Sequence, residues 1–158
     1  IMAATLIGNY FKIDLKNIIK GISSYIPSNN RSQIIKKNSN KIILDAYNAN
    51  PSSMYAAINF FDDLKDKDKV FILGDMFELG KNEIFYHQEI VDYCKGIKSK
   101  KIFLVGELFS KTEKFKEFNY SKNVDELIAK KELSEIKNSN FLIKGSRGIK
   151  LEKIIDHI

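Results

Sequence analysis

The stretch Asp45-Ala46-Tyr47-Asn48-Ala49-Asn50-Pro51-Ser52-Ser53-Met54 decides the fold of this chain, because a strand gives way to a helix within it. An apolar run at residues 42–44 precedes the stretch, and apolar residues at helical spacing follow over residues 51–67. Asn50 suits the N-cap of that helix, and Pro51 suits its first position. The stretch therefore predicts a strand, a short polar loop and a helix in succession, as in α/β folds.

Three side chains of this loop are not explained by helix capping. Asp45, Tyr47 and Asn48 are crowded between the strand and the N-cap. In open α/β sheets the ligand groups lie at the carboxyl ends of strands, and a helix start adds free N–H groups that suit an anion. These residues leave two interpretations open, a helix-capping turn and a ligand-binding loop.

The succession of strand, glycine loop and helix recurs along the chain. Apolar runs at residues 70–73, 102–105 and 141–143 each end at or near a glycine. Short, continuously apolar strands are typical of buried parallel sheets. We therefore predict an α/β fold with a Rossmann-like, mostly parallel sheet and helices on both faces. The other predicted elements are an edge hairpin of residues 33–37 and 41–45, a weak strand at 116–120, and helices at 51–67, 83–97, 107–116, 124–137 and 149–158.

The first thirty residues differ from the rest and predict a domain boundary. Residues 1–13 have the pattern of a helix end, and Asp14 can cap a second helix. The segment Pro27-Ser28-Asn29-Asn30 then forms a turn-rich break. We expect residues 1–28 to be helices from the end of one domain and residues 29–158 to form the next domain.

Composition argues against nucleic acid and membranes as partners. The formal net charge is +6 and the pI about 9.2, but the lysines alternate with acids and do not interleave with aromatic residues. No apolar run reaches the length of a membrane span. The single cysteine, Cys94, falls on a helical apolar stripe, so we expect a buried thiol, a reducing compartment and a cytoplasmic location.

Arginine is scarce, since Arg31 and Arg147 are the only two among 26 basic residues. Arginine offers a carboxylate or phosphate a planar pair of donors that lysine does not. Arg147 lies in the loop Lys144-Gly145-Ser146-Arg147-Gly148, whose charged, hydroxyl and backbone N–H groups favour an anion site. The alternative is a solvated turn before a helix, because Gly and Ser are common turn residues.

The loop at residues 74–80 also carries polar groups. Asp75 and Glu78 suit either Mg²⁺ binding and acid–base chemistry or helix capping at the surface, and we favour the second interpretation. His87 lies on the apolar side of the following helical pattern, which predicts a core histidine with one hydrogen bond. The sequence holds no Cys/His cluster that suits zinc.

Three loops together carry a resemblance to a known family. They are Asp-Ala-Tyr-Asn-Ala-Asn-Pro at residues 45–51, Leu-Gly-Asp-Met-Phe-Glu-Leu-Gly at 73–80, and Ile-Lys-Gly-Ser-Arg-Gly at 143–148. In order and spacing they resemble the C-terminal domain of the Mur ligases, and residues 1–28 resemble the end of that family's central ATPase domain. The resemblance implies an ATP-dependent ligase that joins D-alanyl-D-alanine to UDP-N-acetylmuramoyl-tripeptide in peptidoglycan precursor synthesis.

The resemblance also implies roles for individual residues. Arg31 matches the catalytic arginine that reaches ATP from the interdomain linker, where Asn30 stands in place of a frequent glycine. Asp45 matches the acidic residue at the nucleotide ribose. The other residues implied on the nucleotide side are Tyr47, Asn48 and Asn50, and the loop implied for the dipeptide comprises Lys144, Gly145, Ser146 and Arg147.

The family's P-loop and Mg²⁺ ligands belong to its central domain, so the resemblance implies no metal ligands in this chain. The implied partners are ATP with Mg²⁺, the UDP-linked tripeptide, D-alanyl-D-alanine, and the protein's own N-terminal and central domains. We expect the 158-residue chain alone neither to hydrolyse ATP nor to form a peptide bond. The alternative is a non-catalytic α/β ligand-binding module.

Overall fold

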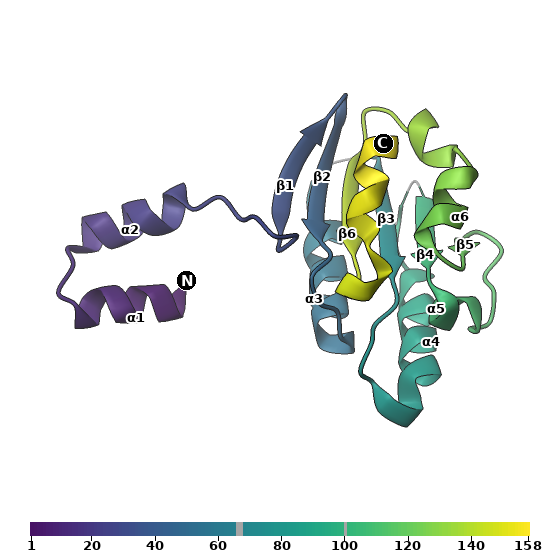
Figure 1. Cartoon of the computed structure of the whole chain (residues 1–158), viewed down its shortest axis with the longest axis horizontal. Coiled ribbons are helices and arrows are strands. Elements are labelled where there is room, and N and C mark those ends of the chain that lie inside the picture. Colours follow the sequence, from purple (N-terminus) through teal and green to yellow (C-terminus); the bar gives the residue numbers. More distant parts are fainter. Residues whose placement is uncertain (66–67, 100) are drawn as a thin grey trace.

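A six-stranded sheet forms the centre of the structure, a computed structural model that describes residues 1–65, 68–99 and 101–158. The strand order is β1-β2-β6-β3-β4-β5, and only β1 runs antiparallel to its neighbour (Figure 1). The predicted mostly parallel α/β sheet is therefore confirmed. The strands are β1 (Gln33–Lys37), β2 (Asn40–Asp45), β3 (Lys69–Gly74), β4 (Lys101–Val105), β5 (Asn119–Ser121) and β6 (Asn140–Lys144).

Helices cover both faces of this sheet, as expected. Helices α3 and α4 pack on one face, while α6 and the 3₁₀ helix η4 pack on the other (Figure 1). The α-helices are α1 (Met2–Tyr10), α2 (Leu15–Ser24), α3 (Pro51–Asp62), α4 (Glu83–Cys94), α5 (Glu107–Ser110) and α6 (Val124–Ala129). The 3₁₀ helices are η1 (Gly80–Asn82), η2 (Glu132–Glu135), η3 (Arg147–Ile149) and η4 (Leu151–His157).

Successive strand residues point to opposite faces, so each inner strand contributes to two cores. In β3, Val70 and Ile72 join the core beneath α6 and η4, whereas Phe71 and Leu73 join the core beneath α3 and α4. Every residue of β3 is buried, which explains the continuously apolar run at residues 70–73. Cys94 lies in the second core, where burial raises the pKa of its thiol to about 12, so the predicted buried thiol is confirmed.

Three predicted helices are wrong in length or type. The helix expected at 107–116 has four residues, and the helix expected at 124–137 ends at Ala129 because Lys131 adopts a left-handed φ of 57°. The helix expected at 149–158 is a 3₁₀ helix that begins after another left-handed residue, Lys150. Its buried residues Leu151 and Ile154 are three apart, a spacing that suits three residues per turn.

Other element ends need smaller corrections. The helix expected at 51–67 ends at Asp62, and residues 66 and 67 lie outside the described residues. The weak strand expected at 116–120 is Asn119–Ser121. Asp14 stands at the N-cap of α2, but its side chain makes no capping hydrogen bond.

Helices α1 and α2 form a hairpin that stands apart from the sheet and is joined to it by an extended linker (Figure 1). A groove of about 800 Å³ lies between the two helices, and apolar side chains line most of it. Many large apolar residues of this hairpin are exposed, among them Leu6 and Phe11 at 69% each. Among the described residues, no helix combines the length and apolar character needed to cross a membrane.

Candidate functional site

The three polar loops meet at the carboxyl ends of β2, β6 and β3, as parallel strands require. The parallel register pairs Asp45 of β2 with Lys144 of β6, which in turn pairs with Leu73 of β3. Hydrogen bonds also join the loops, because Ser146 N–H donates to the Asp75 carbonyl at 3.0 Å and Phe77 N–H donates to Ser146 Oγ at 2.9 Å. Residues far apart in sequence therefore form one rim.

An ion pair connects β2 and β6 at this rim. Lys144 Nζ lies 2.6 Å from Asp45 Oδ2 and donates a second hydrogen bond to the Asn48 carbonyl at 3.2 Å. Asp45 Oδ1 accepts the backbone N–H of Ser32 at 3.1 Å. The carboxylate thus ties the end of the linker to the end of the sheet. Ser32 could not be found from sequence, because its contribution is a backbone N–H, which every residue except proline has.

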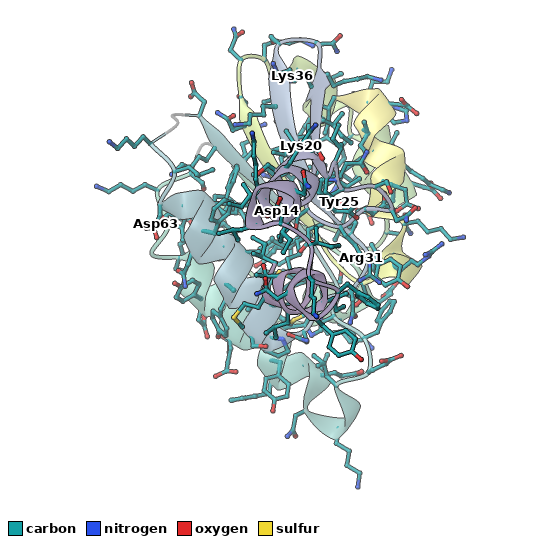
Figure 2. The ribbon with its side chains drawn as sticks, turned by 90° about the vertical axis from the view of Figure 1, so that its left-hand side faces the viewer. Asp14, Lys20, Tyr25, Arg31, Lys36 and Asp63 are labelled. Atoms are coloured by element: carbon teal, nitrogen blue, oxygen red, sulfur yellow. The ribbon has the colours of Figure 1, made fainter. Side chains whose placement is uncertain are left out.

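Both arginines of the chain lie against one tyrosine. The Arg31 guanidinium carbon is 3.7 Å from the centre of the Tyr47 ring, and that of Arg147 is 5.4 Å away, both within cation–π range. Contact with the Arg31 guanidinium, together with its charge and that of Arg147, lowers the pKa of the Tyr47 hydroxyl. Both arginines are exposed, so their donors can reach a ligand. Figure 2 views the molecule from the hairpin side, with Arg31 labelled.

The conformation of the linker suits its sequence. Asn29 and Asn30 adopt left-handed φ values of 62° and 59°, a region that asparagine tolerates better than most residues. Asn30 therefore holds a backbone conformation that is also open to glycine. Ser32 also has a left-handed φ, 48°, which costs more for this residue type.

The asparagines of the first loop are occupied locally. Asn50 caps α3, accepting the Ser53 N–H at 2.9 Å, while the Ser53 hydroxyl accepts the Asn50 N–H at 3.1 Å. Asn48 Oδ1 accepts the N–H of Ala49 at 2.9 Å. Both asparagines are exposed. The capping interpretation of Asn50 is thus confirmed, while its expected contact with a nucleotide stays a prediction.

The residues expected to bind the dipeptide differ in accessibility. Lys144, Gly145 and Ser146 are buried, whereas Arg147 is exposed. An added Cβ at Gly145 would lie 2.9 Å from the Gly74 Cα, so the two strand ends approach too closely for a side chain there. Arg147 is therefore the member of this set best placed to contact a ligand directly.

The loop at residues 74–80 has a structural basis of its own. Asp75 is buried, and its two carboxylate oxygens accept the N–H groups of Leu108 and Phe109 at 2.8 and 2.9 Å, at the start of α5. Asp75 therefore has the favoured capping role, but at a buried and not a surface position. Of the two acids, Glu78 is the exposed one. In the described part of the chain, no three His, Cys, Asp or Glu residues are grouped so as to hold a metal ion.

His87 makes two hydrogen bonds in the core, one more than predicted. Its Nε2 accepts the Met76 N–H at 2.9 Å, and its Nδ1 lies 2.6 Å from the Glu83 carbonyl, so the proton of the neutral ring sits on Nδ1. Burial lowers the pKa of His87, although the Glu83 carbonyl and the Asp75 carboxylate oppose that shift. A cation would lose the bond to Met76, so the ring holds the loop only when neutral.

The contribution of His87 to stability is expected to fall as the pH falls from about 7 to 5.5. The lowered pKa of folded His87 means that the unfolded chain takes up its proton first, which subtracts up to about 1.4 kcal/mol per pH unit from the free energy of unfolding. Urea unfolding at the two pH values measures this slope. His87→Gln should reduce it, while His157→Gln, at an exposed position, should keep it; equal slopes in both variants would contradict the assignment.

Comparisons with known proteins show the family of this chain. A family model described as "Mur ligase, glutamate ligase domain" matches residues 30–147. The UDP-N-acetylmuramoyl-tripeptide--D-alanyl-D-alanine ligase of Bacillus subtilis is 37% identical over 164 residues, covering 98% of this chain and 36% of that protein. The ligase of the same name from Rickettsia prowazekii is 35% identical over 156 residues, covering 91% of this chain and 33% of its own length.

Solved structures show the same likeness. MurF from Acinetobacter baumannii matches with a TM-score of 0.78 and 25% identity, over 92% of this chain and 34% of that one. MurF from Thermotoga maritima, in complex with ADP, shares the fold with a TM-score of 0.76 at 18% identity, over 96% of this chain and 35% of that one. The chain spans about a third of the length of the curated relatives it matches. It belongs to the Mur ligase family, over the family's glutamate ligase domain.

Proposed function

We propose that the complete protein carrying this chain is an ATP-dependent ligase that adds D-alanyl-D-alanine to UDP-N-acetylmuramoyl-tripeptide. The observation that supports this most is the pair of exposed arginines held against Tyr47 at the rim of the sheet. The names of the Bacillus and Rickettsia relatives support the choice of substrates. We expect the tripeptide carboxylate to be phosphorylated to an acyl phosphate, which the amine of the dipeptide then attacks with release of phosphate.

Both arginines suit the charges of this reaction. Arg31, beside the linker, would neutralise phosphate oxygens of a nucleotide held between this domain and its neighbour, an electrostatic contribution that strengthens as phosphoryl transfer proceeds. Arg147 would pair with the carboxylate of the dipeptide through two parallel hydrogen bonds. Contact of both guanidinium groups with the Tyr47 ring offsets part of their mutual repulsion.

We expect the nucleotide to lie against the loop that the linker contacts through Asp45 and Tyr47. Asn48 and Asn50, in the loop that contains Tyr47, are exposed, and the Asp45 carboxylate is partly exposed, with lone pairs left for ribose hydroxyls. The described residues offer no grouped set of metal ligands, so we propose that the Mg²⁺ accompanying ATP is held by the preceding domain. Mg²⁺ would neutralise phosphate charge there.

The hairpin of α1 and α2 supports the existence of that preceding domain. The two helices leave an apolar groove and many apolar side chains exposed to solvent. A surface of this kind suits burial against a larger apolar partner. We propose that residues 1–28 complete the central ATPase domain and residues 29–158 form the C-terminal domain. The linker then lets the rim close on the nucleotide.

The direct test is ADP release by the complete polypeptide that contains this chain. We expect release only when ATP, the UDP-linked tripeptide and D-alanyl-D-alanine are all present, and none from the 158-residue chain alone. Omission of each component in turn is the control. ADP release without the dipeptide would contradict the proposed acceptor. Binding of nucleotide without any turnover would favour a non-catalytic ligand-binding module instead.

A further inference from the structure

Lys144 is a charged residue enclosed at a rim where charged ligands are proposed to bind. Its side chain is 3% exposed, whereas that of its partner Asp45 is 26% exposed. The ammonium has two acceptors, the Asp45 carboxylate at the end of β2 and the Asn48 carbonyl in the loop that follows. A lysine enclosed in this way has little surface to offer a dipeptide, so its charge acts on its protein partners, Asp45 and Asn48.

The partners of Lys144 lead directly to the linker. Asp45 uses one oxygen for Lys144 and the other for the backbone N–H of Ser32, the residue after Arg31. Ser32 holds a left-handed φ of 48°, which an untethered serine seldom adopts. The hydrogen bond from Ser32 to Asp45 therefore stabilises a backbone conformation that the linker would otherwise leave.

We propose that Lys144 is a positioning residue that fixes the Arg31 linker, by holding Asp45 and the loop at residues 45–50 in place. The proposal rests on the role of Arg31 given under the proposed function. Lys144 keeps the Asp45 carboxylate neutralised, so an acid beside the linker does not repel the phosphates that Arg31 is to bind. It also holds Asn48, one residue from Tyr47, on whose ring Arg31 stacks.

The test compares two buried lysines in the 158-residue chain. Lys144→Met keeps the length of the side chain and removes its charge, while Lys144→Arg keeps the charge. Lys69→Met is the matched control, because Lys69 is 8% exposed and bonds to Asp62 at the end of α3, on the amino-terminal side of β3. NMR measures two quantities, hydrogen exchange of the Ser32 amide and titration of the Tyr47 phenol.

In Lys144→Met we expect exchange of the Ser32 amide to accelerate about tenfold or more, which corresponds to about 1.4 kcal/mol of lost protection. The pKa of Tyr47 should rise, because its lowering depends on Arg31. In Lys144→Arg, the Ser32 exchange rate and the Tyr47 pKa should lie closer to those of the unchanged chain. In Lys69→Met, both should equal those of the unchanged chain. A folded Lys144→Met chain with both quantities unaltered would overturn the proposal.

Two further measurements separate the possible failures. If Lys144→Met does not fold, Asp45→Asn removes the ion pair at the more exposed partner and should give the same two shifts, and their absence would overturn the proposal. In the complete ligase, Lys144→Met should lower kcat while leaving KM for the dipeptide unchanged, whereas a direct dipeptide contact would raise KM. If the complete protein has no ligase activity, the proposed function is refuted. The two NMR quantities do not depend on that activity and still test whether Lys144 fixes the linker.

Discussion

Replacing Arg31 with lysine is expected to lower kcat of the complete ligase by about 100-fold, the effect of losing one aligned donor at a developing charge. Lysine keeps the positive charge but loses the planar donor pair and the stacking on Tyr47. Because Arg31 is exposed, the fold does not depend on it, and the urea midpoint should change little. Steady-state ADP release and urea unfolding measure the two effects.

The other arginine supplies the comparison. Arg147→Lys should mainly raise KM for D-alanyl-D-alanine, because its proposed partner is the carboxylate of the bound dipeptide. Lys36→Arg is the control for exchanging one exposed cation for another, since Lys36 lies opposite Lys41 in the strand register, at the other end of the sheet and well away from Arg31 (Figure 2). An unchanged kcat in Arg31→Lys would remove Arg31 from the proposed catalytic role.

The sheet could be predicted from sequence because each buried parallel strand is a short, continuously apolar run. The gathering of the polar loops followed from the same reasoning, since parallel strands align their carboxyl ends. Helix lengths could not be predicted equally well, because apolar spacing continues past residues that leave the helix. Lys131 adopts a left-handed φ just after α6 and Lys150 does so just before η4, and lysine is not a residue type that marks such a turn.

The orientation of side chains at the rim was harder to predict than their location. Lys144 and Arg147 are three residues apart in one polar loop, yet the first is enclosed and the second is exposed. The burial of Lys144 depends on Asp45, which is 99 residues away in sequence and becomes its neighbour through the strand register. Tertiary pairing of this kind leaves no local pattern.

Substitution of Gly106 by alanine is expected to cost about 3 kcal/mol of the free energy of unfolding, as strained backbone and steric overlap together do. Gly106 has a φ of +139°, which L-residues rarely adopt, and an added Cβ would lie 2.1 Å from the Asp75 carboxyl carbon. That carboxylate caps α5, so its displacement would also free the N–H groups of Leu108 and Phe109. Urea unfolding of the 158-residue chain measures the loss.

Gly96→Ala is the matched control, because the nearest atom to an added Cβ there is the Tyr93 carbonyl oxygen at 3.7 Å, an ordinary contact. It should change the free energy of unfolding by no more than about 0.5 kcal/mol. Asp75→Asn, combined with Gly106→Ala, tests the cause: if the carboxylate is the obstacle, the losses should not add, because both changes disturb the same cap. Additive losses, or a Gly106→Ala chain as stable as Gly96→Ala, would contradict the close approach of Asp75 to this glycine.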